Sequence, residues 1–236
     1  MSASDKSKKI QINRAILFFF LTLLFSTGSA HAQNTPANPQ DETQFWNETQ
    51  ILIPINKKTD LFLVGVLRAG ANNSGFLRPI DERGGAGIAF KLSKYLTVMP
   101  TYVYVAQQPT PVRKNAEHRL ILNVTPKFAL GRFTFTDRNL IEFRVRHSLS
   151  NFVMYRNRLQ IDYPVKIGEF GFKLFVADEA WYSTLLDTWV RNRISGGIIK
   201  QFTPHFAAEF FYLRQNDGRA RPGDAHVFGT LFRINL

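Results

Sequence analysis

Residues 228–236 read FGTLFRINL, and they alternate in polarity along their whole length. In an extended chain, successive side chains point to opposite faces of the sheet. One face of this segment carries Phe228, Thr230, Phe232, Ile234 and Leu236, and the other carries Gly229, Leu231, Arg233 and Asn235. The segment predicts a strand with an apolar face toward lipid and a more polar face toward a lumen, with an edge strand of a soluble sandwich as the alternative.

The end of this strand looks like the C-terminal signal read by the outer-membrane assembly machinery. In that signal an apolar residue closes an alternating strand, and the usual last residue is aromatic. Leu236 departs from that preference. We therefore expect the assembly machinery and outer-membrane lipid to be partners of the chain.

Similar alternation recurs along most of the chain. These stretches match the roughly 9–11 residues that cross a bilayer at a tilt, whereas strands of globular proteins average about 5–6 residues. The sequence therefore predicts an all-β fold, an antiparallel up-and-down transmembrane β-barrel of about 10–12 strands. The expected strands are 43–55, 59–67, 83–91, 95–105, 117–128, 133–146, 154–165, 171–182, 189–201, 205–214 and 225–236.

The number of these stretches raises a question of topology. Eleven is odd, whereas a single-chain barrel with both ends in the periplasm needs an even number of strands. Either 43–55 is a lead-in segment, giving ten strands, or one strand is missed, giving twelve. Alternation in 133–146 also places Asp137 and Asn139 on the lipid face, so we expect a bulge near them.

The connections between the stretches alternate in length as well. Short ones include Asn56-Lys57-Lys58 and Ala129-Leu130-Gly131, whereas long polar ones include 68–82 and 215–224. Short periplasmic turns and longer outer loops are typical of outer-membrane barrels.

The N-terminal residues predict export. Basic residues precede a short apolar run, Ala15–Phe25, and small residues follow up to Ala32. This order is typical of a cleavable signal peptide, and the run is shorter than the roughly 20 residues of a spanning helix. We expect a signal-peptide helix at 1–32, a polar lead at 33–42 and the barrel at 43–236.

The charge balance excludes one class of partner and suggests another. The chain has a net charge of +12 and no cysteine. A basic balance favours nucleic acid, an anionic membrane surface or an acidic solute, but an exported chain rarely meets nucleic acid. We therefore expect no nucleic-acid partner, and localisation in a bacterial outer membrane.

Several short motifs resemble an uncharacterised bacterial family, the domain of unknown function 2490 family. They are Trp46, Glu117-His118-Arg119, Glu142-Phe143-Arg144-Val145-Arg146, Tyr155-Arg156-Asn157-Arg158-Leu159 and Phe228–Arg233. The resemblance covers nearly all of the chain after the signal. It implies an outer-membrane barrel and supplies no activity.

A set of charged residues shares the expected lumen face. Arginines recur where strands meet the long loops, and glutamates lie on facing strands. One interpretation is a narrow porin-like channel whose electropositive lumen admits small anionic solutes. The alternative is an arginine–glutamate network that fills the lumen of a structural or interaction barrel. The candidates are Arg83, Glu117, Arg119, Glu142, Arg144, Arg146, Arg156, Arg158, Glu179, Arg191, Arg193 and Glu209.

A lipid-modifying enzyme is a weaker alternative. His147 and Ser148 lie in an outer loop, but adjacent residues of a strand point to opposite faces, which separates a base from a nucleophile. Other histidines are scattered, and the glycines at 84–87 precede no helix. The sequence therefore predicts no catalytic, metal or cofactor site.

Overall fold

The computed structural model describes residues 42–71, 77–110, 113–147, 149–217 and 223–236, in which the chain forms eleven strands and no helix. The strands are β1 (Glu42–Asn56), β2 (Thr59–Ala71), β3 (Leu77–Ser93), β4 (Leu96–Thr110), β5 (Arg113–Leu130), β6 (Phe133–Arg146), β7 (Phe152–Ile167), β8 (Phe170–Ser183), β9 (Thr188–Thr203), β10 (Phe206–Asn216) and β11 (Ala225–Asn235).

Each of the eleven stretches expected from alternation forms one of these strands. Glu42, expected in the polar lead, is the first residue of β1. The expected signal peptide and the rest of the lead lie outside the described residues. Within the described residues, no helix is long and apolar enough to cross a membrane.

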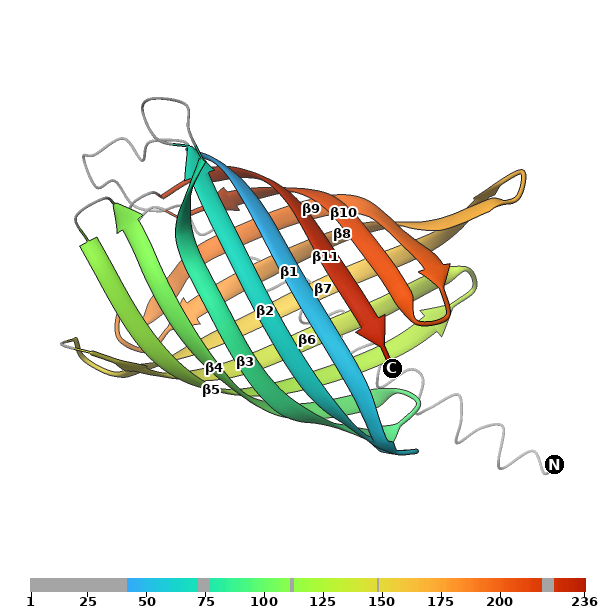
Figure 1. Ribbon diagram of the computed structural model, residues 1–236, viewed down its shortest axis with the longest axis horizontal. Coiled ribbons are helices and arrows are strands. Elements are labelled where there is room, and N and C mark those ends of the chain that lie inside the picture. Colours follow the sequence, from blue (N-terminus) through green and yellow to red (C-terminus); the bar gives the residue numbers. More distant parts are fainter. Residues whose placement is uncertain (1–41, 72–76, 111–112, 148, 218–222) are drawn as a thin grey trace. The chain divides into compact units, whose positions relative to one another are not determined.

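The strands close into one barrel (Figure 1). Strands consecutive in the sequence pair antiparallel, and β1 closes the barrel by pairing parallel with β11, from Glu42 opposite Ala225 to Leu52 opposite Asn235. The predicted barrel of about 10–12 strands is therefore confirmed, with eleven strands in the described residues, but the expectation of an even number is wrong. It assumed that both ends of the barrel chain lie at the same rim, whereas β1 starts at the long-loop rim and β11 ends at the short-turn rim.

The connections β1–β2, β3–β4, β5–β6, β7–β8 and β9–β10, each of two residues, lie at the rim where β11 ends. Gly131 and Gly168, in the β5–β6 and β7–β8 turns, both have a φ of 59°. A backbone in this left-handed region favours glycine, which lacks a Cβ. These tight turns hold neighbouring strands in antiparallel register.

Small residues also lie where β3 approaches β4 closely. A Cβ on Gly85 would lie 2.5 Å from the backbone oxygen of Tyr102, and one on Gly87 would lie 2.5 Å from that of Pro100. Glycine at these positions lets the two strands come together inside the wall.

Aromatic side chains of the outer wall differ between the two rims. Near the short turns they are mostly phenylalanines in contact, such as Phe128 stacked on Phe135 with ring centroids 4.9 Å apart. Near the long loops they carry polar atoms. Tyr102 lies beside His118, and Tyr182 packs edge-on against Trp189.

The aromatic residues around the β8–β9 loop divide between the two faces. Trp181 is 2% exposed inside the barrel, whereas Trp189 is 45% exposed on the outer wall. The pairing of β8 with β9 shifts register between Trp181 and Tyr182.

A polar stripe crosses the outer wall over β6 to β9. Asp137 lies near the short-turn end of β6, and Asn192 lies near the long-loop end of β9. The pairing of β6 with β5 and β7 contains no register shift, so the bulge expected near Asp137 is wrong. Neighbouring strands supply partners instead: Asn157 donates to Asp137 at 2.6 Å and to Asn139 at 3.0 Å.

The remaining bonds of the stripe complete this pairing. The Tyr155 hydroxyl donates to Asn139 at 2.6 Å, and Asn192 donates to Asp178 at 2.7 Å. Both carboxylates of the stripe, Asp137 and Asp178, therefore accept a hydrogen bond from an amide of an adjacent strand.

We expect Asn157→Ala to destabilise the barrel by about 1–3 kcal/mol, because it removes a donor from a buried carboxylate. The free energy of unfolding is measured by denaturant titration of the refolded barrel in detergent or lipid. Asn47→Ala is the matched control, since Asn47 donates at 2.8 Å to a neutral partner on the same wall, Thr230. A loss for Asn157→Ala no larger than that for Asn47→Ala would contradict this account.

Candidate functional site

The inner face of the barrel carries charged residues that meet across the lumen. The guanidinium of Arg193 on β9 lies 4.7 Å from the ring centroid of Trp46 on β1, although β10 and β11 separate these strands in the wall. A contact that skips two strands runs through the interior. We name the buried charged and aromatic side chains at this level, toward the long-loop rim, the lumen layer.

Three strands supply the layer with the same local motif, an acid followed two residues later by arginine. Residues two apart on a strand share a face. Arg83 therefore binds Asp81 through two bonds of 2.6 Å, and Arg119 binds Glu117 at 2.6 and 2.8 Å. Arg144 binds its motif partner in the same way.

Glu142 is the centre of one half of the layer, and its side chain is fully buried. Arg144 lies 2.5 Å from one carboxylate oxygen, and Arg156 lies 2.5 Å from the other. Arg119 lies 3.9 Å away. Three guanidiniums from β5, β6 and β7 therefore surround a carboxylate that no solvent reaches.

Glu179, on β8, joins this group to β9. It lies 2.7 Å from Arg156, 3.3 Å from Arg193 and 3.5 Å from Arg138. Arg156 thus bridges Glu142 and Glu179, which ties β6, β7 and β8 together through their inner faces.

Guanidinium and indole groups alternate across the lumen. Arg68 lies 3.8 Å from the ring centroid of Trp46, and Arg193 lies 4.7 Å from it. Arg193 also lies 4.5 Å from the centroid of Trp181, and Arg156 lies 3.9 Å from that ring. A cation over the face of an aromatic ring is attracted to the electrons of that face, and this attraction is stronger where water is excluded. We name this sequence of Arg68, Trp46, Arg193, Trp181 and Arg156 the guanidinium–indole stack.

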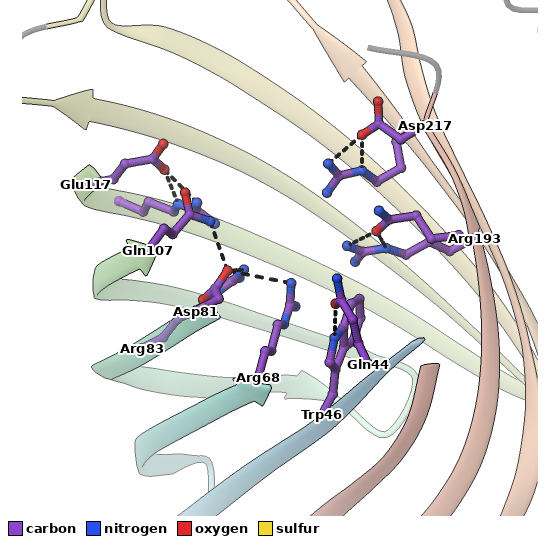
Figure 2. A network of polar contacts seen from close by, with 12 residues as sticks. Gln44, Trp46, Arg68, Asp81, Arg83, Gln107, Glu117, Arg193 and Asp217 are labelled. Atoms are coloured by element: carbon purple, nitrogen blue, oxygen red, sulfur yellow. Dashed lines mark hydrogen bonds and ion pairs between the residues drawn. The ribbon is translucent and has the colours of Figure 1, made fainter. Parts of the chain in front are cut away.

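Figure 2 shows one part of the layer, with Trp46, Arg68 and Arg193 beside Asp81 and Asp217. Asp81 accepts from Gln107 at 2.9 Å and lies 3.7 Å from Arg68. Arg191 binds Asp217 at 2.6 Å, just beyond the end of β10. These contacts anchor β2, β3 and β9 to the layer.

The candidates from sequence divide into two groups. The layer contains Arg83, Glu117, Arg119, Glu142, Arg144, Arg156, Glu179, Arg191 and Arg193.

Three candidates lie apart from the layer. Arg146 binds the backbone oxygen of Ser150 at the long-loop rim. Arg158 binds Gln160, and Glu209 pairs with Arg233.

Sequence reasoning missed six members of the layer: Trp46, Arg68, Asp81, Arg138, Trp181 and Asp217. Alternation along each strand could have placed Trp46 and Arg68 on the inner face. Trp46, however, also contacts Arg193 of β9, a strand that is not its neighbour in the sequence.

The outer loops contain the residues considered for catalysis. His147 helps to line a cleft of about 650 Å³ with Asp81, Gln107 and Lys114. Ser148 lies outside the described residues. Among the residues that the structure describes, no three His, Cys, Asp or Glu side chains are grouped to hold a metal ion.

The model of one protein family, described as Protein of unknown function (DUF2490), matches residues 43–226. The chain belongs to this family. No curated protein matches the chain. Among solved structures it is similar to LpxR from Salmonella typhimurium at 9% identity and a TM-score of 0.45, covering 77% of this chain and 83% of the other. A likeness this distant does not bear on function.

Membership agrees with the resemblance carried by the sequence motifs. Two of those motifs, Glu117–Arg119 and Glu142–Arg146, supply acids and arginines to the lumen layer of this DUF2490 protein. These two motifs therefore build part of the interior of the barrel.

We expect Glu142→Gln to destabilise this DUF2490 barrel by about 3–5 kcal/mol, because three guanidiniums would then surround a neutral amide. Denaturant unfolding of the refolded protein measures the change. Glu169→Gln is the control, because Glu169 is exposed in a turn opposite Lys166, and it should leave the unfolding curve unchanged. Equal curves for the two variants would refute the role given to Glu142.

Proposed function

We propose that the protein is an outer-membrane barrel whose lumen layer closes the interior, so that it acts as a structural or interaction barrel through its outer loops. The observation that carries this proposal is the guanidinium–indole stack, which extends from β2 through β1, β9 and β8 to β7. Its side chains occupy the space that an open channel needs for water.

The outer wall supports a membrane location. Large apolar side chains are exposed around it, including Leu120 at 57%, Val176 at 60%, Ile194 at 59% and Phe228 at 58%. Apolar surface on a closed barrel, with aromatic residues toward both rims, suits a lipid surround. The last strand supports recognition by the assembly machinery, since Phe228, Phe232 and Ile234 share its outer face.

Burial of the layer supports closure over conduction. The side chains of Arg119 and Arg193 are each 3% exposed, and that of Glu142 is fully buried. A wide water-filled channel would hydrate such groups. The excess of arginine over acid in the layer favours a second candidate, a narrow path for small anions.

The proposal that the protein is not an enzyme is supported by the hydrogen-bond partners of three histidines. His118 and His226 each bond a tyrosine hydroxyl on the outer wall, at 2.7 Å. His205 bonds the backbone oxygen of Asn235 at the short-turn rim. None of these three bonds joins a histidine to a serine or threonine nucleophile.

Single-channel recording in a planar bilayer tests closure. We expect the refolded wild-type barrel to pass no discrete current. The Trp46→Ala, Trp181→Ala double variant should conduct with anion selectivity, because it empties the stack and leaves its arginines.

Trp189→Ala is the matched control, since Trp189 lies on the outer wall, and it should stay silent. Circular dichroism establishes that each variant is folded. Discrete anion-selective steps from the wild-type protein would overturn closure and support the anion path.

A further inference from the structure

The lumen layer contains more positive than negative charge. Among the residues that the structure describes, its ion pairs connect eight arginines with five carboxylates, and adding Glu42, which lies on the same face and binds Gln44, makes six. Burying an uncompensated charge is costly. The arginines are Arg68, Arg83, Arg119, Arg138, Arg144, Arg156, Arg191 and Arg193, and the carboxylates are Asp81, Glu117, Glu142, Glu179 and Asp217.

The layer also lacks hydrogen-bond acceptors. Four of its buried nitrogens have no partner: the Nε atoms of Arg68, Arg138 and Arg156, and Nε1 of Trp181. All four are donors. Buried polar groups in folded proteins nearly always find a partner, so a set of unpaired donors indicates a missing acceptor.

Charge and acceptor are lacking at the same place. Trp181 is 2% exposed, and its ring is contacted by Arg156, by Arg193 at 4.5 Å and by Arg191 at 4.8 Å. Arg193 also contacts the ring of Trp46, which in turn contacts Arg68. Arg156 and Arg191 are also close enough to repel Arg68 electrostatically. One bound anion would both offset the excess positive charge and accept hydrogen bonds from the unpaired donors.

We propose that the lumen layer binds a small inorganic oxyanion of the phosphate or sulfate class between Trp181, Arg156, Arg191, Arg193 and Arg68. Guanidinium forks pair with such anions through two parallel bonds. Several oxygens are needed because the donors come from β2, β7, β8 and β9. The bound anion would neutralise part of the charge excess. This inference does not depend on whether the barrel conducts.

Tryptophan fluorescence tests the site directly. The chain has three tryptophans, so a Trp189→Phe background reports only on Trp46 and Trp181, both in the layer. Titration of the refolded barrel with sodium phosphate, at ionic strength held constant with sodium fluoride, should give a saturable change in emission. Arg68→Gln should weaken the apparent affinity about tenfold or more, since it removes one charged donor.

The test variant and its control replace arginines in different places, one in the layer and one at a turn. Of the four arginines of the proposed site, Arg68 lies farthest from its carboxylate partner, 3.7 Å from Asp81. We therefore expect its replacement to perturb the layer least. Arg132→Gln is the matched control, because Arg132 lies at a turn and bonds the backbone oxygen of Pro164 at 3.1 Å. It should bind phosphate as the background does.

A second measurement uses the unmodified protein. Phosphate should raise the unfolding temperature of the wild-type barrel progressively once its concentration exceeds the dissociation constant, and fluoride at equal ionic strength should not. Either a change in emission that never saturates, or equal affinity in Arg68→Gln and Arg132→Gln, would overturn the proposal. An unfolding temperature indifferent to phosphate would also overturn it. Conductance is recorded separately, so failure of the anion site and failure of closure are distinguishable.

Discussion

A carboxylate that water cannot reach must be surrounded by cations, and Glu142 is the place where this barrel meets that requirement. Its three guanidinium partners come from β5, β6 and β7, so its pairing fixes how those strands lie. Because side chains alternate with period two, a slip of one residue would turn the acid and its arginine outward together. Asp81–Arg83 and Glu117–Arg119 place the same demand on β3 and β5. The charged interior thus specifies strand register as well as filling space.

The sequence predicted the strands well because each depends on local alternation alone. It also identified most arginines of the layer, since the face of a strand residue follows from parity. It did not identify Trp46 as a partner of Arg193, because that contact joins strands distant in the chain. Similarly, Trp181 and Trp189 appear equivalent in sequence. The register shift after Trp181 and the burial of its ring among arginines place one inside and one outside.

The polar stripe shows the same limit on the outer wall. Asp137 violates the expected pattern for a lipid-facing position, and alternation alone offers only a bulge as a remedy. The molecule keeps the regular ladder and satisfies the carboxylate with amides on neighbouring strands, chiefly Asn157. The lumen and the stripe therefore use different chemistry: arginine pairs with acids in the lumen, whereas asparagine bonds Asp137 and Asp178 in the stripe. The second solution adds no cation to the stripe.

The parallel seam between β1 and β11 separates the two ends of the barrel chain by the full height of the wall. Hydrogen bonds extend it at both rims, from Glu42 to Asp224 and from Leu236 to Leu52. In barrels whose first and last strands are antiparallel, a short peptide can join the two ends and new termini can be opened in any loop. Here a circular permutant would need a linker that runs from one rim to the other. Rearranging the order of the strands is therefore far harder for this architecture than cutting a loop.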